Sequence, residues 1–260
     1  MMSVKFDIEA RRQSLYSERS FAEMMLGNTY PVRVYARHGD VLRGTVTVAD
    51  KGSFSVHTAY VICESDSNTS VTHAKAVGVM IDRNTQGVSL VLAVGEKAEY
   101  AWAQHEIAEA VDYWEGDNDL RILCLRERSC GAVVYTSDGA DRRYLVIRMN
   151  LGHCGLPKGH IEKYETEEET AVREVKEETG VEITLIDGFR KSVEYSLSAR
   201  TKKESVYFLG RFDGDAVKIQ EAEVSSYRLC PYDEARRLIT YENDRVILDD
   251  AEKLLSEMEA

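Results

Sequence analysis

Four charged residues on one predicted helix carry the clearest chemical signal in the sequence. They are Arg173, Glu174, Glu177 and Glu178, at positions i, i+1, i+4 and i+5. The three glutamates share a face, because residues three and four apart are neighbours on a helix, and each like-charged pair costs about 0.2–0.5 kcal/mol. A solvated acidic helix would tolerate this repulsion. A hard divalent cation such as Mg²⁺ would relieve it with oxygen ligands and leave sites free for water and phosphate.

The helix itself is predicted over Glu167–Thr179. Thr166 and Glu169 form a capping box at its start, in which each side chain satisfies a free backbone N–H group of the other residue. Gly180 ends the helix, because glycine adopts the left-handed conformation without steric cost. The apolar stripe that would seat the helix on a sheet consists of Ala171, Val172 and Val175.

The segment Gly159–Val181, GHIEKYETEEETAVREVKEETGV, resembles the signature of the Nudix hydrolase superfamily at every specified position. The resemblance implies an α/β/α sandwich around a mixed sheet. It also implies that the protein binds Mg²⁺ or Mn²⁺ and hydrolyses a nucleoside diphosphate linked to another group. The specified positions are Gly159, Glu165, Arg173, Glu174, Val175, Glu177, Glu178, Gly180 and Val181.

The same resemblance implies roles for individual residues. Glu174 and Glu178 are implied metal ligands, together with the carbonyl group of Gly159. Arg173 is implied to orient a carboxylate through a charge-assisted hydrogen bond. Glu177 is either a further ligand or the general base. Superfamily members differ in which carboxylate acts as the base, so a glutamate outside the helix stays a candidate.

A wider stretch, from about Ser129 to the C-terminus, is similar to the asymmetric diadenosine tetraphosphate hydrolases of this superfamily. The run HCGLPKGH at His153–His160 carries much of the similarity, although Cys154 stands where that family usually has tryptophan. The similarity implies cleavage of a dinucleoside tetraphosphate into a nucleoside triphosphate and a monophosphate. Further matching segments are Phe189–Lys191 to Tyr195, Lys202–Lys203 to Tyr207, and Glu223 before Tyr227 and Arg228.

Five residues in these segments are candidates for the substrate and metal sites. Lys158 and Lys203 could each meet a phosphate as a point charge, or be ordinary surface lysines. Tyr195 and Tyr207 could enclose an adenine, since stacking a base on an aromatic ring contributes about 1–3 kcal/mol. Both tyrosines lie in apolar strands, so core packing is the alternative. Glu223, in a loop before a strand, could close the metal site or act as the base, or be a solvated surface residue.

The pattern of predicted strands and helices changes near residue 128. Residues 1–127 contain five short predicted strands separated by turn signals, then a helix over Gln104–Trp114 and one more strand, which favours a small barrel or sandwich. Residues 128–260 mix strands with a few helices, which predicts an α/β domain. At 260 residues the chain is long enough for two cores. We therefore expect a β-rich accessory domain at 1–127 and a Nudix domain at 128–260.

The order of elements in residues 1–127 faintly resembles the barrel of soluble inorganic pyrophosphatases. Such barrels need a cluster of aspartates for their metals, but Ser53–Thr58, SFSVHT, contains no carboxylate at the place of that acidic loop. The resemblance therefore implies a degenerate barrel with no pyrophosphatase activity of its own. An unassigned β-rich domain that packs on the hydrolase, dimerises or restricts its substrate is the alternative.

Composition and charge narrow the functional classes. Apolar residues make up 43% and charged residues 30%, as in a globular protein. The formal net charge of −12 argues against non-specific attraction to nucleic acid or to an anionic membrane. The five cysteines form no CxxC pair, and no apolar run reaches the roughly 18 residues of a spanning helix. We expect reduced, mostly buried thiols and a cytoplasmic protein without a membrane partner.

A small-molecule nucleotide is the expected substrate, and a dinucleoside polyphosphate is favoured. The enzymatic alternative is removal of pyrophosphate from triphosphorylated RNA 5′ ends, or cleavage of another nucleoside diphosphate derivative. A nucleotide-sensing regulator that binds without cutting is the alternative of another class, and the complete set of charged helix residues argues against it. The sequence leaves homodimerisation open.

Overall fold

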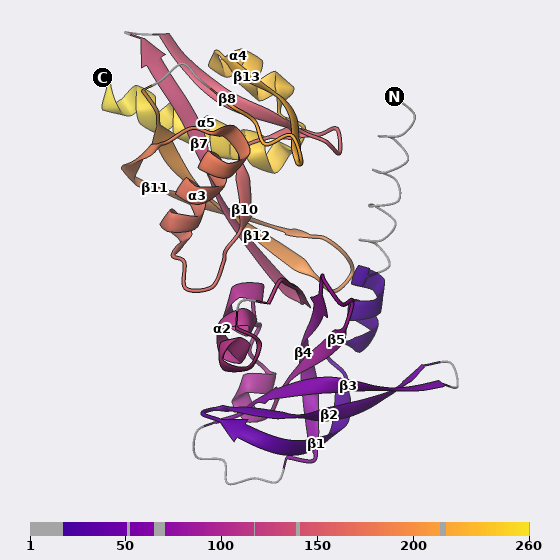
Figure 1. Ribbon diagram of the computed structural model, residues 1–260. Helices are drawn as coiled ribbons and strands as arrows, with labels where there is room; N and C mark the ends of the chain where they lie inside the picture. The colour runs from indigo at the N-terminus through magenta and orange to yellow at the C-terminus, as the bar shows by residue number, and fades with distance from the viewer. Residues whose placement is uncertain are drawn as a thin grey trace, which may run out of the picture. The chain divides into compact units, whose positions relative to one another are not determined.

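The structure is a computed structural model that describes residues 18–50, 53–64, 71–116, 118–138, 141–213 and 217–259 (Figure 1). The chain forms two compact units. The first ends at Glu127 and also contains Ser196–Lys202, and the second comprises Arg128–Tyr195 and the chain from Lys203 onward. Ser196–Lys202 thus lies within the stretch 128–260 that the sequence assigns to the second domain, but it belongs to the first unit.

Six strands and one main helix build the first unit. They are β1 (Thr29–His38), β2 (Val41–Asp50), β3 (Ser53–Ile62), β4 (His73–Asp82), β5 (Val88–Ala93) and β6 (Leu120–Cys124), with the 3₁₀ helix η1 (Gly95–Ala98) and α2 (Gln104–Glu115). The strand order is β1-β2-β3-β5-β4-β6, and β1 also pairs with β4, so the first five strands close into a ring. The β3–β5 pair is parallel and the others are antiparallel. The β-rich, barrel-like form predicted for this part is confirmed.

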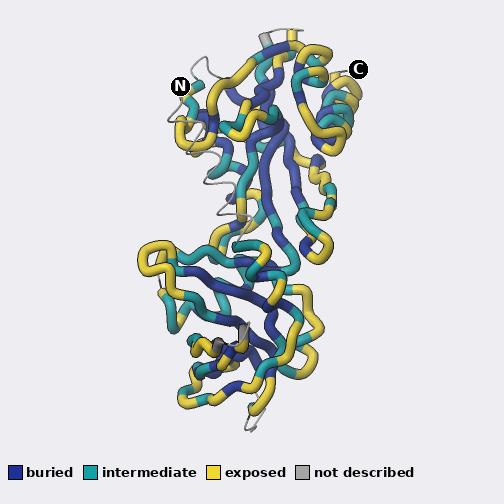
Figure 2. Tube along the Cα trace, turned by 90° about the vertical axis from the view of Figure 1, so that its right-hand side faces the viewer, coloured by how far each residue is buried: buried dark blue, intermediate teal, exposed yellow. Residues whose placement is uncertain are grey.

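Alternate residues of the barrel strands face two separate cores. Leu42 of β2 is buried inside the barrel. Tyr60 of β3 lies on the outer face, where Ile107 and Val111 of α2 cover it. Figure 2 shows continuous buried stretches inside the unit, which in the sequence fall on β4 and β5. The period of two along each strand thus fills the barrel from one side and seats α2 on the other.

A helix at residues 18–25, which the sequence pattern did not predict, precedes β1. Arg200 binds its C-terminal carbonyl groups: NH1 donates to the carbonyl of Glu23 at 2.8 Å and NH2 to the carbonyl of Leu26 at 2.7 Å. Gly27 follows with a φ of 77°, and a side chain there would meet the Arg200 guanidinium group. These bonds tie the returning segment to the first unit.

The second unit is a layered α/β structure. Its elements are β7 (Arg126–Asp138), β8 (Asp141–Met149), β9 (Cys154–Gly155), β10 (Lys158–His160), α3 (Glu167–Thr179), β11 (Thr184–Ser196), β12 (Lys202–Arg211), β13 (Val224–Cys230), α4 (Tyr232–Leu238) and α5 (Glu242–Met258). The strand order is β11-β12-β7-β8-β13, with β10 on β7 and β9 on β8.

Alternation along the strands produces three layers in this unit. Val133 of β7 packs with α4 and α5, whereas its neighbour Val134 packs with Val175 of α3. On β12, Tyr207 lies on the α5 side and Phe208 on the α3 side. The predicted α/β/α sandwich around a mixed sheet is confirmed.

Local patterns placed most elements of the second unit, with two exceptions. The sequence predicts separate strands at Glu182–Ile186 and Lys191–Leu197, but β11 is a single strand that contains Gly188 with a φ of 86°. The predicted loop Asn150–Glu165 contains β9 and β10. Strands of two or three residues are too short to show a side-chain period, and backbone pairing with distant strands creates them.

All five cysteines are free thiols. Cys63, Cys124, Cys130 and Cys230 are buried, and Cys154 is partly exposed. The expected reduced and mostly buried thiols are confirmed. Among the described residues, no helix has the length and apolar character needed to cross a membrane.

We expect Arg200→Ala to lower the free energy of unfolding of the full chain by about 1–3 kcal/mol. The substitution removes two hydrogen bonds that a charged side chain donates, and it leaves the carbonyl groups at the end of the helix without this donor. Urea denaturation followed by circular dichroism measures the change. Arg211→Ala is the matched control, because the partner of Arg211 is the largely exposed Asp213 and such surface pairs contribute about 0–1 kcal/mol. Equal losses in both variants would contradict this role for Arg200.

Candidate active site

Local signals fix both ends of α3, the helix that carries the acidic residues. Thr166 Oγ1 accepts a hydrogen bond from the Glu169 N–H group at 3.1 Å, and the Glu169 carboxylate accepts one from the Thr166 N–H group at 2.8 Å. Gly180 follows the helix in the left-handed conformation, with a φ of 68°. The predicted capping box and glycine stop are confirmed.

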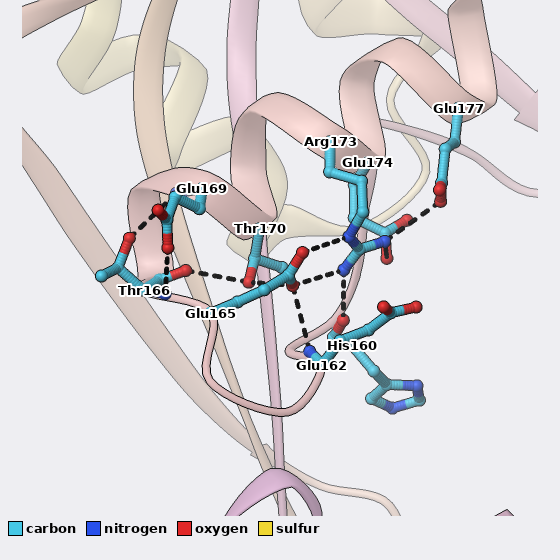
Figure 3. A network of polar contacts seen from close by, with 9 residues as sticks. All are labelled: His160, Glu162, Glu165, Thr166, Glu169, Thr170, Arg173, Glu174 and Glu177. Carbon is cyan, nitrogen blue, oxygen red and sulfur yellow. Dashed lines mark hydrogen bonds and ion pairs between the residues drawn. The ribbon is translucent and has the colours of Figure 1, made fainter. Parts of the chain in front are cut away.

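Arg173 lies at the centre of a network of hydrogen bonds on this helix (Figure 3). Its Nε and Nη2 atoms donate to the two carboxylate oxygens of Glu165 at 2.6 and 2.8 Å. Its Nη1 atom donates to Glu174 at 2.8 Å and to Glu177 at 3.0 Å. Nη2 also donates to the carbonyl group of His160 at 2.9 Å. One guanidinium group therefore joins three carboxylates to the chain that enters the helix.

Glu165 is the member of this network to which sequence reasoning gave no role. Its Oε2 atom also accepts hydrogen bonds from the Glu162 N–H group at 3.1 Å and from the Thr170 hydroxyl at 2.8 Å. Burial opposes its ionisation, but the bonds from Arg173, Glu162 and Thr170 outweigh burial and lower its pKa. Glu165 is one of the specified positions of the Nudix signature, and this position was the signal in the sequence that could have indicated a role for it.

Glu178 and Glu174 face the interior side of the site. Glu178 is only 2% exposed, and its Oε2 atom accepts a hydrogen bond from the Lys158 N–H group at 3.0 Å. Burial and repulsion by Glu174 raise the pKa of Glu178 to about 8, against the opposing charge of Lys158. Burial also raises the pKa of Glu174, although Arg173 opposes it. A further positive charge at this point would stabilise both ionised carboxylates.

Gly159 lies directly against the Glu174 carboxylate. β10 pairs Gly159 with Cys130 of β7, which fixes its backbone at the edge of the sheet. A Cβ atom at Gly159 would overlap the Glu174 carboxylate group. Glycine therefore allows this close approach without displacing the Glu174 side chain, and the helix carboxylate and the strand backbone can share one site.

Glu223 joins the site from the segment before β13. Its side chain is exposed, and its charge contributes to the raised pKa values of both Glu174 and Glu178. Its carbonyl group accepts a hydrogen bond from the Asn150 N–H group at 2.8 Å. The fold thus brings a fourth carboxylate near the helix face from a distant part of the chain.

The remaining substrate candidates lie on β10, β11 and β12. Lys158 is partly buried and its charge acts directly on Glu178. Tyr195 and Lys203 are partly exposed, and they lie at the two ends of the segment Ser196–Lys202. The structure therefore brings Lys158 to the acidic residues and leaves Tyr195 and Lys203 on the two neighbouring strands.

Tyr207 is not available for stacking on a base, so this part of the predicted adenine site is wrong. Its side chain is fully buried in the core between the sheet and α5. Its hydroxyl donates to Asp244 Oδ1 at 2.7 Å, and burial together with Asp244 raises its pKa. The strand alternation that turns Phe208 toward α3 turns Tyr207 toward α5. Tyr195 lies close enough to contribute to the raised pKa of Tyr207, but only Tyr195 is accessible.

Comparisons with known proteins agree with this geometry. A family model described as NUDIX domain matches residues 125–251. An RNA pyrophosphohydrolase of Erythrobacter litoralis is 33% identical over 139 residues, which are 44% of this chain and 82% of that protein. An asymmetrical bis(5′-nucleosyl)-tetraphosphatase of Sus scrofa is 29% identical over 145 residues, which are 51% of this chain and 98% of that protein. A C. elegans Ap4A hydrolase binary complex aligns with a TM-score of 0.47 and 22% identity, covering 50% of this chain and 98% of that one.

The acidic helix, the sandwich around it and the family match define the class of protein. The chain belongs to the Nudix family. It is a hydrolase that acts on phosphorus-containing anhydrides. The matched residues 125–251 include the whole network around Arg173.

We expect the stability of the metal-free protein to fall between about pH 4.5 and 8 because of Glu178. The pKa of this group rises from 4.5 to about 8 on folding, so its contribution to stability is complete below pH 4.5 and is lost as the pH rises through 8. Glu178→Gln stays neutral and keeps an acceptor for the Lys158 N–H group. Its melting temperature in chelator should match that of the wild type at pH 5 and exceed it by at least about 3 °C at pH 8.

Glu177→Gln is the control for this experiment, because Glu177 lies on the same helix face and its side chain is 52% exposed. Its difference from the wild type should not grow over the same pH range. A difference for Glu178→Gln that is constant with pH would contradict the cost assigned to the buried charge.

We expect Tyr207→Ala to lower the free energy of unfolding by about 3–5 kcal/mol, as for other large aromatic side chains removed from a core. Tyr207→Phe removes only the hydroxyl and leaves Asp244 without this donor, which costs about 1–3 kcal/mol. Tyr195→Ala, at a half-buried position, should cost less than Tyr207→Ala. Urea denaturation measures all three. A small loss of stability in Tyr207→Ala with a raised KM would restore Tyr207 to the substrate site.

Proposed function

We propose that this hydrolase cleaves dinucleoside polyphosphates asymmetrically, so that a tetraphosphate such as diadenosine tetraphosphate gives a nucleoside triphosphate and a monophosphate. The observation that carries the proposal is a pair of neighbouring carboxylates, the buried Glu178 and the partly buried Glu174, beside Gly159 and Lys158. They combine oxygen ligands for a cation with a positive charge for phosphate. The Sus scrofa relative, covered over 98% of its length, supports the choice of substrate.

The donor set of the site fits Mg²⁺ or Mn²⁺. Glu174, Glu178 and the carbonyl group of Gly159 are oxygen ligands of the kind that hard divalent cations take, and Glu223 is close to both glutamates. Within the described ranges, no three acidic, histidine or cysteine side chains are close enough together to hold a metal ion. In this arrangement Glu174 accepts a hydrogen bond from Arg173. A cation held here neutralises phosphate charge and lowers the pKa of coordinated water.

The residues around this donor set have separable roles in the proposed reaction. Lys158 and Lys203 bind phosphate oxygens as point charges. Arg173 holds Glu174 and Glu177 in place through charge-assisted hydrogen bonds. Glu177 and Glu223 are exposed carboxylates that can take a proton from the attacking water. Positioning and charge neutralisation supply most of the rate in phosphoryl transfer, so few groups need to change protonation.

Tyr195 alone remains for stacking on the base. One aromatic face contributes about 1–3 kcal/mol per base, and it does so without hydrogen-bond readout of the base edge. We therefore expect the enzyme to tolerate different bases in a dinucleoside polyphosphate. The proposal places the enzyme in the cytoplasm, where free thiols stay reduced. Homodimerisation stays an untested expectation.

Removal of pyrophosphate from RNA 5′ ends is the second candidate function. The Erythrobacter litoralis relative, at 33% identity and 82% coverage of its length, favours it. A triphosphorylated RNA end and a dinucleoside polyphosphate present the same phosphoanhydride chain to the acidic site. The two substrates differ in the groups attached to this phosphate chain, which are two nucleosides in one case and one RNA chain in the other. Their products therefore distinguish the two functions.

Product analysis tests the proposal directly. The full chain with Mg²⁺ should convert diadenosine tetraphosphate to ATP and AMP, and reaction in ¹⁸O-water should label one of the two products. Release of two ADP molecules would contradict asymmetric cleavage. Faster release of pyrophosphate from a triphosphorylated RNA would assign the second function.

We expect Glu178→Gln to lower kcat for the preferred substrate by at least about 100-fold, because the amide keeps the shape of the side chain and removes the charge that holds the cation. Glu168→Gln is the matched control, since Glu168 is an exposed glutamate of the same helix. Its kcat should stay within about twofold of the wild type. Comparable activity of all three proteins would refute the assigned helix face.

A further inference from the structure

The outer face of the barrel carries a set of residues that the hydrolase reaction does not use. Residues directly opposite each other in paired strands share a face, so the strand registers define the set. Arg33 lies opposite Thr45 and Thr45 opposite Thr58, while Arg43 lies opposite Tyr60. We call the part of this surface beyond α2 the open face. Its members by register are Arg33, Arg43, Thr45, Thr47, Phe54, Val56 and Thr58, and Tyr35 joins them from the β1 bulge, where its charge acts on Tyr60.

Large apolar side chains of the open face are exposed to solvent. Phe54 is 76% exposed, Val56 68% and Tyr35 61%. Tyr113 at the end of α2 is 64% exposed and stacks on His38 with ring centroids 3.4 Å apart. Exposed aromatic residues gathered on one face indicate an interaction site, whereas singly scattered ones do not.

The charge of the open face differs from that of the whole chain. Its strand positions carry Arg33 and Arg43 and no acidic side chain. Arg43 lies over the rings of Tyr60 and Trp114, with its Cζ atom 5.8 and 5.5 Å from their centroids. The neighbouring Glu115 already accepts hydrogen bonds from Tyr60 and Asn118. The net charge of −12 therefore does not describe this face.

Hydrogen-bonding capacity is also unused here. Arg43 Nε and Trp114 Nε1 are buried, and neither meets an acceptor among the described residues. The hydroxyl groups of Thr45, Thr47 and Thr58 lie in neighbouring positions on the same face. Guanidinium and hydroxyl groups between aromatic rings suit a ligand with phosphates, sugar hydroxyls and flat bases.

We propose that the open face binds single-stranded RNA. The barrel order β1-β2-β3-β5-β4, closed by β1 on β4, is that of the OB-fold, which presents the face of its second and third strands to oligonucleotides (Figure 1). The open face lies on those strands. Aromatic rings take up unstacked bases, the two arginines meet phosphates, and the threonine hydroxyls reach the 2′-hydroxyl groups that distinguish RNA from DNA. The assignment does not depend on the substrate of the hydrolase.

Fluorescence anisotropy tests the proposal on the full chain. The probe is a labelled oligouridine of about twelve nucleotides with a 5′-hydroxyl end, which contains no phosphoanhydride, in a buffer with chelator. Binding should be saturable at low salt. Tyr35→Ala and Phe54→Ala should each raise Kd by at least about fivefold. Arg33→Gln should make the slope of log K against log salt shallower by about 0.7.

Tyr100→Ala is the matched control. Tyr100 is a tyrosine of the same unit with 50% of its surface exposed. It precedes α2 and is therefore at the end of that helix opposite to Tyr113 and the open face. Its Kd should stay within about twofold of the wild type. Absence of binding, or equal Kd values in Tyr35→Ala, Phe54→Ala and the wild type, would overturn the proposal. Equal affinity for the matching DNA would overturn the assignment to RNA. A dimer in sedimentation that Phe54→Ala dissociates would assign the face to a second copy of the chain.

Discussion

The guanidinium group of Arg173 resolves the main conflict in the sequence, which is the crowding of carboxylates on one turn of α3. It donates to Glu165, Glu174 and Glu177 at once, and also to the backbone where β10 ends at His160. A lysine could not do this, because only the planar guanidinium group presents five donors in a fixed fork. Helix, entry loop and strand are therefore fixed relative to one another through one charged group.

Close approach of backbone and carboxylate is the second constraint on the site. The Glu174 carboxylate lies against the backbone of Gly159, where a Cβ atom would overlap it, and the Lys158 N–H group donates to Glu178. The same burial raises the pKa values of both glutamates. The fold thus bears a cost in the metal-free state that the proposed cation would remove, which is typical of sites arranged for function rather than for stability.

The two units differ in chemistry and are still connected by more than one linker. Carboxylates and Lys158 dominate the reactive part of the second unit, while arginine, threonine and aromatic side chains dominate the open face of the first. Ser196–Lys202 returns to the first unit between β11 and β12. Tyr195 and Lys203 immediately flank that segment. The first unit therefore includes a segment from within the hydrolase sequence.

The sequence by itself determined the features that depend on neighbouring residues in the chain. The bounds of α3, its capping box, its glycine stop and the helix face of Glu174 and Glu178 follow from a 3.6-residue period and from local hydrogen bonds. The spacing of the predicted strands and turn signals likewise indicated a barrel-like part, and the mixture of strands and helices a layered part. Only the tertiary structure decided what each strand face would meet. It buried Tyr207 under α5 and left Tyr195 accessible, it brought Glu223 to the acidic residues, and it returned Arg200 to the helix at residues 18–25. These outcomes depend on contacts between residues far apart in the chain, which no local period specifies.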